Sequence, residues 1–411
     1  MTIFNKYYFY LKRAIFYLHN FGIRETIKKI ADFYRNGNTK LLSDGIEPPD
    51  GIEPPRALVS MRSFNSIQPK NILILTNCQI KQCIDYRVKQ KMSILKSIGV
   101  NSKLISPISH KEVKELLPFA YKVIIYRSSV DEELMTILLN SESSIVFEFD
   151  DLIVGPCEVD KSGILQNLTK LQRENLLRES YDLEQTFLSC DEAIVSTEFL
   201  RDWYSESYAN MKIKSLDNFL IRHDFFSNVQ KKYDFCYSSP STSIDSELTL
   251  LNDFLCEFDR LATEEWSALI LGNDTAYNFL SSKNYNNGSI FLKPFCSYDA
   301  YILNLSEAKY ILIPLFEMPF NKGKTKIRFL DSLISGSIPI VTSFEGGYEA
   351  FLKDVDSQRI VVHANDWKKV VNNIFCLNGD YSNTLHSLQK RAKETYGPTR
   401  AQKIYKDFFS V

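Results

Sequence analysis

One stretch of the chain, residues 309–349, constrains the fold more than any other. It reads KYILIPLFEMPFNKGKTKIRFLDSLISGSIPIVTSFEGGYE. Two short apolar runs within it, Tyr310–Leu315 and Ile338–Val341, are typical of buried parallel strands. Between them, apolar residues at helical spacing predict a helix that Thr325 caps and Gly336 ends. A strand, a basic loop, a helix and a second strand in this order are typical of a nucleotide-binding α/β unit.

The loop before the predicted helix carries four cations and no acid: Lys322, Lys324, Lys326 and Arg328. They lie beside backbone N–H groups that a helix start leaves unpaired, so the loop suits a phosphate. The alternative is a solvated basic turn, but the position between two buried strands favours the phosphate. Asp331, one turn further on, is placed to accept hydrogen bonds from ribose hydroxyls. The alternative for Asp331 is an ordinary exposed helix residue.

The pattern N-x-G-K-(S/T)-x-x-(K/R)-x-x-(E/D), then a small residue, G-x-P-(I/V)-V-x-S and G-G, resembles the donor-nucleotide site of GT-B glycosyltransferases. The nearest resemblance is to family-4-like enzymes of bacterial surface-polysaccharide assembly, and it covers residues 68–411. The matching residues are Asn321, Lys324, Thr325, Arg328, Asp331, Gly336, Pro339, Val341, Ser343, Gly346 and Gly347.

The resemblance implies that the loop and the helix start hold the donor diphosphate, and that Asp331 holds the ribose. The predicted donor-binding residues are Asn321, Gly323, Lys324, Thr325, Arg328, Asp331, Gly346, Gly347 and Ser239. The predicted catalytic residues are Lys324, Arg328 and Asp151. Typical members of the family have Glu where this chain has Asp331, and many have a second Glu where it has Gly323. The usual sugar-contacting acid is therefore not identified.

Residues 68–220 are predicted to form an N-terminal Rossmann-like acceptor domain. Strands are predicted at 71–76, 102–106, 122–126, 144–148 and 191–196, with a helix from about Asp85, a long charged helix over 160–188, and a helix that Thr197 caps. Ligands of such sheets bind outside the carboxyl ends of the strands. The motifs at 86–91, 126–128 and 147–152 also resemble the acceptor side of these enzymes. The candidate acceptor-binding residues are Asp85, Tyr86, Arg87, Arg127, Asp150 and Asp151, and the alternative for the last two is helix capping.

Residues 221–411 are predicted to form a C-terminal Rossmann-like nucleotide-sugar donor domain. Its predicted strands are 233–239, 268–271, 289–292, 310–315, 337–341 and 358–362, and helices near 365–375, 381–395 and 398–410 close the chain. By resemblance, the last helix crosses back to the N-terminal domain. The predicted fold class is thus α/β, GT-B, with two Rossmann-like doubly wound domains facing a cleft and an N-terminal helical extension.

The extension and a linker precede these domains. Residues 1–44 are basic and aromatic and predict helices, and residues 45–67 contain the proline-rich repeat GIEPPDGIEPP, typical of a semi-rigid linker. Residues 1–35 suit an anionic membrane surface, and the alternative is that their aromatic rings pack on the body. No stretch there is long enough for a signal peptide or a membrane span. Scattered cysteines predict reduced thiols and a cytoplasmic protein, either free or peripheral on the inner face of the membrane.

These features predict a glycosyltransferase that moves a sugar from a nucleotide-sugar donor to a glycan or lipid-linked acceptor in surface polysaccharide synthesis. By resemblance the anomeric configuration is retained. No cofactor and no metal are expected, and the net charge of −1 argues against a nucleic-acid partner. One alternative is an inverting transferase with Asp85, Asp150 or Asp151 as general base. The other is a non-catalytic polysaccharide-assembly subunit with a degenerate donor site.

Overall fold

The computed structural model describes residues 71–220, 224–226, 229–239, 245–343, 361–363, 370–372, 374 and 381–409. All of them lie in one compact unit formed by residues 69–411. The predicted extension (1–44) and linker (45–67) lie outside the described residues, as do Gly346 and Gly347.

The N-terminal domain is built on a six-stranded, wholly parallel sheet with the strand order β2-β1-β3-β4-β5-β6. Its four inner strands are buried over most of their length, because helices cover both faces. The edge strand β6 was not predicted, since its sequence KIKS is short, polar and only partly buried. The strands are β1 (Asn71–Leu75), β2 (Asn101–Ile105), β3 (Lys122–Tyr126), β4 (Ser144–Phe149), β5 (Glu192–Val195) and β6 (Lys212–Ser215).

Two helix predictions in this domain need correction. The helix expected from about Asp85 begins at Lys81 and includes a π-helical segment over Ile84–Lys89. The long helix expected over 160–188 is divided, because Gly163 adopts a left-handed backbone with φ 83°. Thr197 caps α8 as predicted, its hydroxyl accepting from the Leu200 N–H. The helices are α2 (Lys81–Cys83), α3 (Gln90–Ser97), α4 (His110–Leu116), α5 (Glu132–Leu139), α6 (Pro156–Lys161), α7 (Lys170–Leu188) and α8 (Glu198–Ser207).

The C-terminal domain repeats this architecture with a second parallel sheet, in the order β12-β11-β10-β7-β8-β9. Its strands are β7 (Tyr233–Ser238), β8 (Trp266–Leu271), β9 (Gly288–Lys293), β10 (Ala308–Ile313), β11 (Ile338–Ser343) and β12 (Val361–His363). Its helices include α9 (Asp245–Leu261), α10 (Asp274–Ser281), α11 (Tyr298–Ser306), α12 (Pro319–Lys322) and α13 (Ile327–Ile334).

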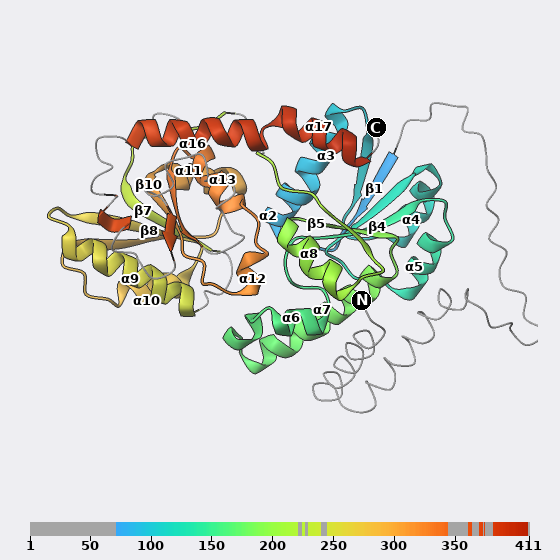
Figure 1. Cartoon of the computed structure of the whole chain (residues 1–411), viewed down its shortest axis with the longest axis horizontal. Coiled ribbons are helices and arrows are strands. Elements are labelled where there is room, and N and C mark those ends of the chain that lie inside the picture. Colours follow the sequence, from blue (N-terminus) through green and yellow to red (C-terminus); the bar gives the residue numbers. More distant parts are fainter. Residues whose placement is uncertain are drawn as a thin grey trace, which may run out of the picture. The chain divides into compact units, whose positions relative to one another are not determined.

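The last two helices connect the two domains. α16 (Tyr381–Tyr396) packs on α13, and α17 (Pro398–Phe409) lies along α3 of the N-terminal domain (Figure 1). Ala401, Tyr405 and Phe409 of α17 are buried with Ile72 and Ile74 of β1. The expected crossing of the last helix to the N-terminal domain is therefore confirmed, as is the α/β fold class with two Rossmann-like domains. None of the helices in the described part of the chain is both long and apolar enough to cross a membrane.

Candidate active site

The four cations of the basic loop point to different neighbours. Lys322 lies 3.4 Å from a carboxylate oxygen of Glu317, and Lys326 lies over the ring of Tyr396, 5.7 Å from its centroid. Lys324 and Arg328 remain near one another: burial lowers the pKa of Lys324, and the nearby Arg328 charge lowers it further. The structure thus keeps Lys324 and Arg328 together as a pair, and directs Lys322 and Lys326 to other neighbours.

The pair lies beside residues that follow β7, the strand next to β10 in the sheet. Arg328 Nη2 donates to Ser239 Oγ at 3.3 Å, just after β7, and Lys324 Nζ lies 3.9 Å from Glu247 Oε1 on α9. Lys324 also lies over the ring of Phe320, 5.2 Å from its centroid. Burial lowers the pKa of Lys324, and the charge of Glu247 opposes this shift. Three predicted donor residues therefore meet at one place.

Glu247 was not among the predicted site residues. In the sequence it is one acid in the polar run DSEL, and nothing in its spacing distinguishes it from a solvated helix residue. In the structure it is 1% exposed. Only the folded arrangement of α9 against the basic loop could reveal it.

Gly323 packs against the N-terminal domain, and Thr325 comes just before the start of α13. A Cβ at Gly323 would lie 2.9 Å from Leu200 Cδ2, so a larger residue at this position would require the Leu200 side chain to move. The Gly323 carbonyl accepts from the Thr197 hydroxyl at 3.4 Å. The predicted capping role of Thr325 is wrong: Lys326 is the N-cap of α13, and it has no side-chain cap.

Asn321 is buried in α12. Its Nδ2 donates to the Phe316 carbonyl at 2.8 Å, which holds the loop after β10 in place. A direct contact of Asn321 with a donor stays a prediction.

Asp331 is not the exposed helix residue of the alternative interpretation, since it is 2% exposed. Its Oδ1 accepts from the hydroxyls of Tyr298, at 2.8 Å, and of Tyr86. Burial raises the pKa of Asp331 to about 7, although the two tyrosine hydroxyls oppose the shift. Tyr86 belongs to the N-terminal domain and was predicted to bind the acceptor, so its contact with Asp331 joins predicted residues of the two domains.

The predicted acceptor residues Arg127, Asp150 and Asp151 form one cluster at the ends of β3 and β4. Arg127 Nη1 donates to Asp150 Oδ1 at 3.0 Å and to Asp151 Oδ2 at 3.1 Å, and Asp150 also accepts from the Tyr126 hydroxyl at 3.0 Å. Arg127 has φ 44°, an uncommon left-handed conformation for a residue with a side chain. Both carboxylates therefore pair with Arg127 rather than capping a helix, as the alternative interpretation had it.

Asp151 lies between the two predicted subsites. Its side chain is 26% exposed. Burial raises the pKa of Asp151, as does the charge of Asp150, while Arg127 and Lys324 oppose the shift. Lys324 of the basic loop therefore lies within electrostatic range of Asp151.

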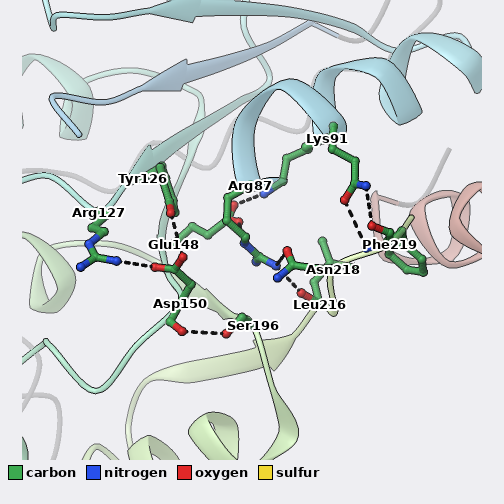
Figure 2. A network of polar contacts seen from close by, with 11 residues as sticks. Arg87, Lys91, Tyr126, Arg127, Glu148, Asp150, Ser196, Leu216, Asn218 and Phe219 are labelled. Carbon is green, nitrogen blue, oxygen red and sulfur yellow. Dashed lines mark hydrogen bonds and ion pairs between the residues drawn. The ribbon is translucent and has the colours of Figure 1, made fainter. Parts of the chain in front are cut away.

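Arg87 is placed differently from the prediction. Its side chain is 2% exposed, and its Nε donates to Glu148 Oε1 at 2.9 Å, so it is committed to the interior of the N-terminal domain. Figure 2 shows Arg87 and Lys91, one turn apart, both reaching Glu148. Arg87 Nη1 also donates to the Leu216 carbonyl at 2.7 Å. Asp85 pairs with Lys89 at 2.6 Å on the same helix. Of the three consecutive residues Asp85, Tyr86 and Arg87, Tyr86 alone therefore reaches the predicted donor site.

Among the described residues, no group of three or more histidine, cysteine or acidic side chains is arranged to hold a metal ion. The cysteines in the same part of the chain are free thiols.

Comparisons with known proteins concern the fold. No protein-family model matches the sequence, and no curated protein sequence matches it either. Solved structures do match. An α-glucosyltransferase in complex with UDP-glucose and DNA has a TM-score of 0.57 at 13% identity. A glycosyltransferase from Rickettsia africae has a TM-score of 0.55 at 12% sequence identity. The sucrose-phosphate synthase of Thermosynechococcus elongatus has a TM-score of 0.54 at 12% identity. Each match covers 83% of this chain and 99% of the other. The chain therefore has the GT-B fold of these glycosyltransferases.

Proposed function

We propose that this protein is a glycosyltransferase that moves a sugar from a nucleotide-sugar donor to a glycan or lipid-linked acceptor in surface polysaccharide synthesis. The observation that carries the proposal is the convergence of Lys324, Arg328 and Ser239 at the carboxyl ends of the C-terminal strands. Open α/β sheets bind their ligands at this edge. The GT-B fold and the resemblance of the loop to a donor site support the same function.

The chemistry follows from the charges. When the glycosidic bond to the donor breaks, negative charge grows on the departing nucleoside diphosphate. Lys324 and Arg328 are held beside that position before the reaction, so their charges stabilise the leaving group without reorganisation. Arg328 adds a planar guanidinium suited to two phosphate oxygens.

We propose retention of the anomeric configuration, on the resemblance of the donor motif. One observation favours inversion as the second candidate. Asp151 is partly exposed, and burial and the Asp150 charge raise its pKa. It therefore suits a general base better than Asp150, which is buried. The stereochemistry of the product distinguishes the two courses.

The decisive experiment is a panel of nucleotide sugars screened for diphosphate release. UDP sugars come first, because solved structures with this fold are described with UDP or UDP-glucose. Each reaction is run with EDTA and with Mn²⁺, since one such structure, from T4 phage, holds UDP and Mn²⁺. We expect release that EDTA does not abolish. Nucleotide binding without transfer to any acceptor would favour the non-catalytic subunit, and absence of nucleotide binding would refute the donor site.

A membrane surface is part of this proposal, through the basic and aromatic residues 1–35. We expect a variant that lacks residues 1–60 to bind the donor normally but to sediment less with anionic vesicles, with neutral vesicles as the control. Unchanged sedimentation would refute membrane binding. Loss of the folded state, seen by circular dichroism, would show that the segment packs on the body.

A further inference from the structure

We infer that Glu247 is a positioning residue of the donor site, which fixes the Lys324 ammonium beside the donor diphosphate. The inference rests on the proposed function, because it assumes that Lys324 meets a diphosphate. Glu247 lies in the first turn of α9 and is almost wholly enclosed, whereas Lys324 comes from the loop after β10. Residues far apart in the sequence thus meet at one point.

A buried carboxylate is costly unless a cation or hydrogen-bond donors compensate it. Glu247 Oε1 is inaccessible and accepts no hydrogen bond within the part of the chain that the structure describes. The cation that compensates it is Lys324, 3.9 Å away. The pair is therefore an electrostatic one, and its distance is longer than a direct hydrogen bond.

This distance has a chemical consequence. A lysine in a direct salt bridge donates one of its three N–H groups to the carboxylate. At 3.9 Å, Glu247 supplies charge and placement but leaves the N–H groups of Lys324 for phosphate oxygens. The ring of Phe320 supports the ammonium from another side.

The charged groups that act on Lys324 come from several elements: Glu247 on α9, Arg328 on α13 and Asp151 after β4. Burial and Arg328 lower the pKa of Lys324, while Glu247 and Asp151 raise it. Without Glu247, Asp151 alone opposes burial and Arg328. The ammonium should then lose its proton at a lower pH, and binding of a diphosphate should weaken from that lower pH upward.

The test is Glu247→Gln, which keeps the shape of the side chain and removes its charge. Affinity for UDP, or for the diphosphate found in the panel, is measured by calorimetry from about pH 6 to about pH 9. We expect affinity within about twofold of the parent at the acid end and about tenfold weaker at the alkaline end, because the uncharged amide no longer stabilises the protonated lysine. Asp253→Asn, an exposed acid on the same helix, is the matched control and should follow the parent throughout.

Two further variants separate positioning from general damage. Arginine keeps its charge over this range, so Lys324→Arg added to Glu247→Gln should abolish the extra pH dependence. Glu247→Asp retains the charge and should lie between the parent and Glu247→Gln, even if the latter folds poorly. Identical pH profiles for the parent and the folded Glu247 variants would overturn this inference alone. A parent protein that binds no nucleotide would overturn the proposed donor site together with it.

Discussion

The two domains share an architecture but differ in how the charged groups at the carboxyl ends of their strands are paired. In the N-terminal domain, Asp150 and Asp151 both accept from Arg127 within 3.1 Å. Two residues earlier, on β4, Glu148 accepts from two buried cations. In the C-terminal domain, Lys324 has its nearest described acid at 3.9 Å. The N-terminal charges therefore neutralise one another at hydrogen-bond distance, whereas the C-terminal lysine lies beyond hydrogen-bond distance of its acid.

This difference favours the C-terminal domain as the one that would receive an anion. A phosphate that entered the N-terminal cluster would meet two carboxylates already bound to Arg127. A phosphate at the basic loop would meet Lys324 and Arg328 together. The N-terminal cluster suits a neutral hydroxyl instead, because a carboxylate oxygen such as that of Asp151 can accept its proton or its hydrogen bond.

The largest expected effect breaks the pairing inside the N-terminal domain. Glu148→Ala leaves Arg87 and Lys91 buried without their acid, and removal of one partner of a buried pair costs about 3–5 kcal/mol of unfolding free energy. Chemical denaturation measures the loss. The control Asp85→Ala breaks the more accessible pair with Lys89 and should cost about 1 kcal/mol or less. A loss below that of the control would show that the network is not structural.

The next effect concerns Asp331, where the two domains meet. Its pKa is about 7 in the folded protein and about 4 when unfolded, so the unfolded chain binds fewer protons between these values. The contribution of Asp331 to stability therefore falls as the pH rises through this window. We expect the unfolding free energy of Asp331→Asn, measured relative to that of the parent, to increase by about 2–4 kcal/mol as the pH rises from about 4 to about 8. Each unit of difference between the folded and unfolded pKa of Asp331 contributes about 1.4 kcal/mol. Parallel stability curves for parent and variant, from denaturation at each pH, would contradict this.

The third effect tests the cation pair of the C-terminal domain. Arg328→Ala removes a charged hydrogen-bond donor worth about 1.5–3 kcal/mol, so affinity for the diphosphate should fall about 10–100-fold. The rate should fall further, because charge on the leaving phosphate grows in the transition state. The gap in calorimetric affinity between nucleoside diphosphate and monophosphate should narrow. Lys322→Ala, beside Glu317 and away from the pair, is the control and should change little. Unchanged affinity of Arg328→Ala would place the donor site elsewhere.

The smallest effect concerns Asp151. If it orients an acceptor hydroxyl, Asp151→Asn should slow transfer about tenfold and leave nucleotide affinity within about twofold, since the amide keeps one acceptor oxygen but loses its charge. Steady-state transfer and calorimetry on the same preparation measure the two quantities. Equal loss of both, or loss of neither, would show that Asp151 does not act on the acceptor.

Several features of the fold could be predicted from local patterns. Apolar runs such as Lys122–Tyr126 identified most strands, and Thr197 was correctly identified as a helix cap. Local rules failed where tertiary contacts decided the outcome. The polar edge strand β6 forms because β5 supplies its hydrogen bonds. Helix α13 begins two residues after Thr325, so the Thr325 side chain does not cap it.

The candidate site shows the same division. The cations Lys324 and Arg328 and the acids Asp150 and Asp151 were visible because chemical type and position after a strand are written in the local sequence. Their partners were not. Glu247 meets Lys324 across two elements, and Tyr86 meets Asp331 across two domains.

By itself, the sequence determined the periodicities that produce two parallel sheets and the residue types at the ends of their strands. The tertiary structure alone decided which of the four loop cations stay together, and that Arg87 belongs to the interior. It also enclosed Asp331 between two tyrosines. The physical reason is that periodicity and chain reversal act over a few neighbouring residues. Burial, by contrast, and with it the pKa and pairing of a charged group, depends on segments that approach only when the chain has folded.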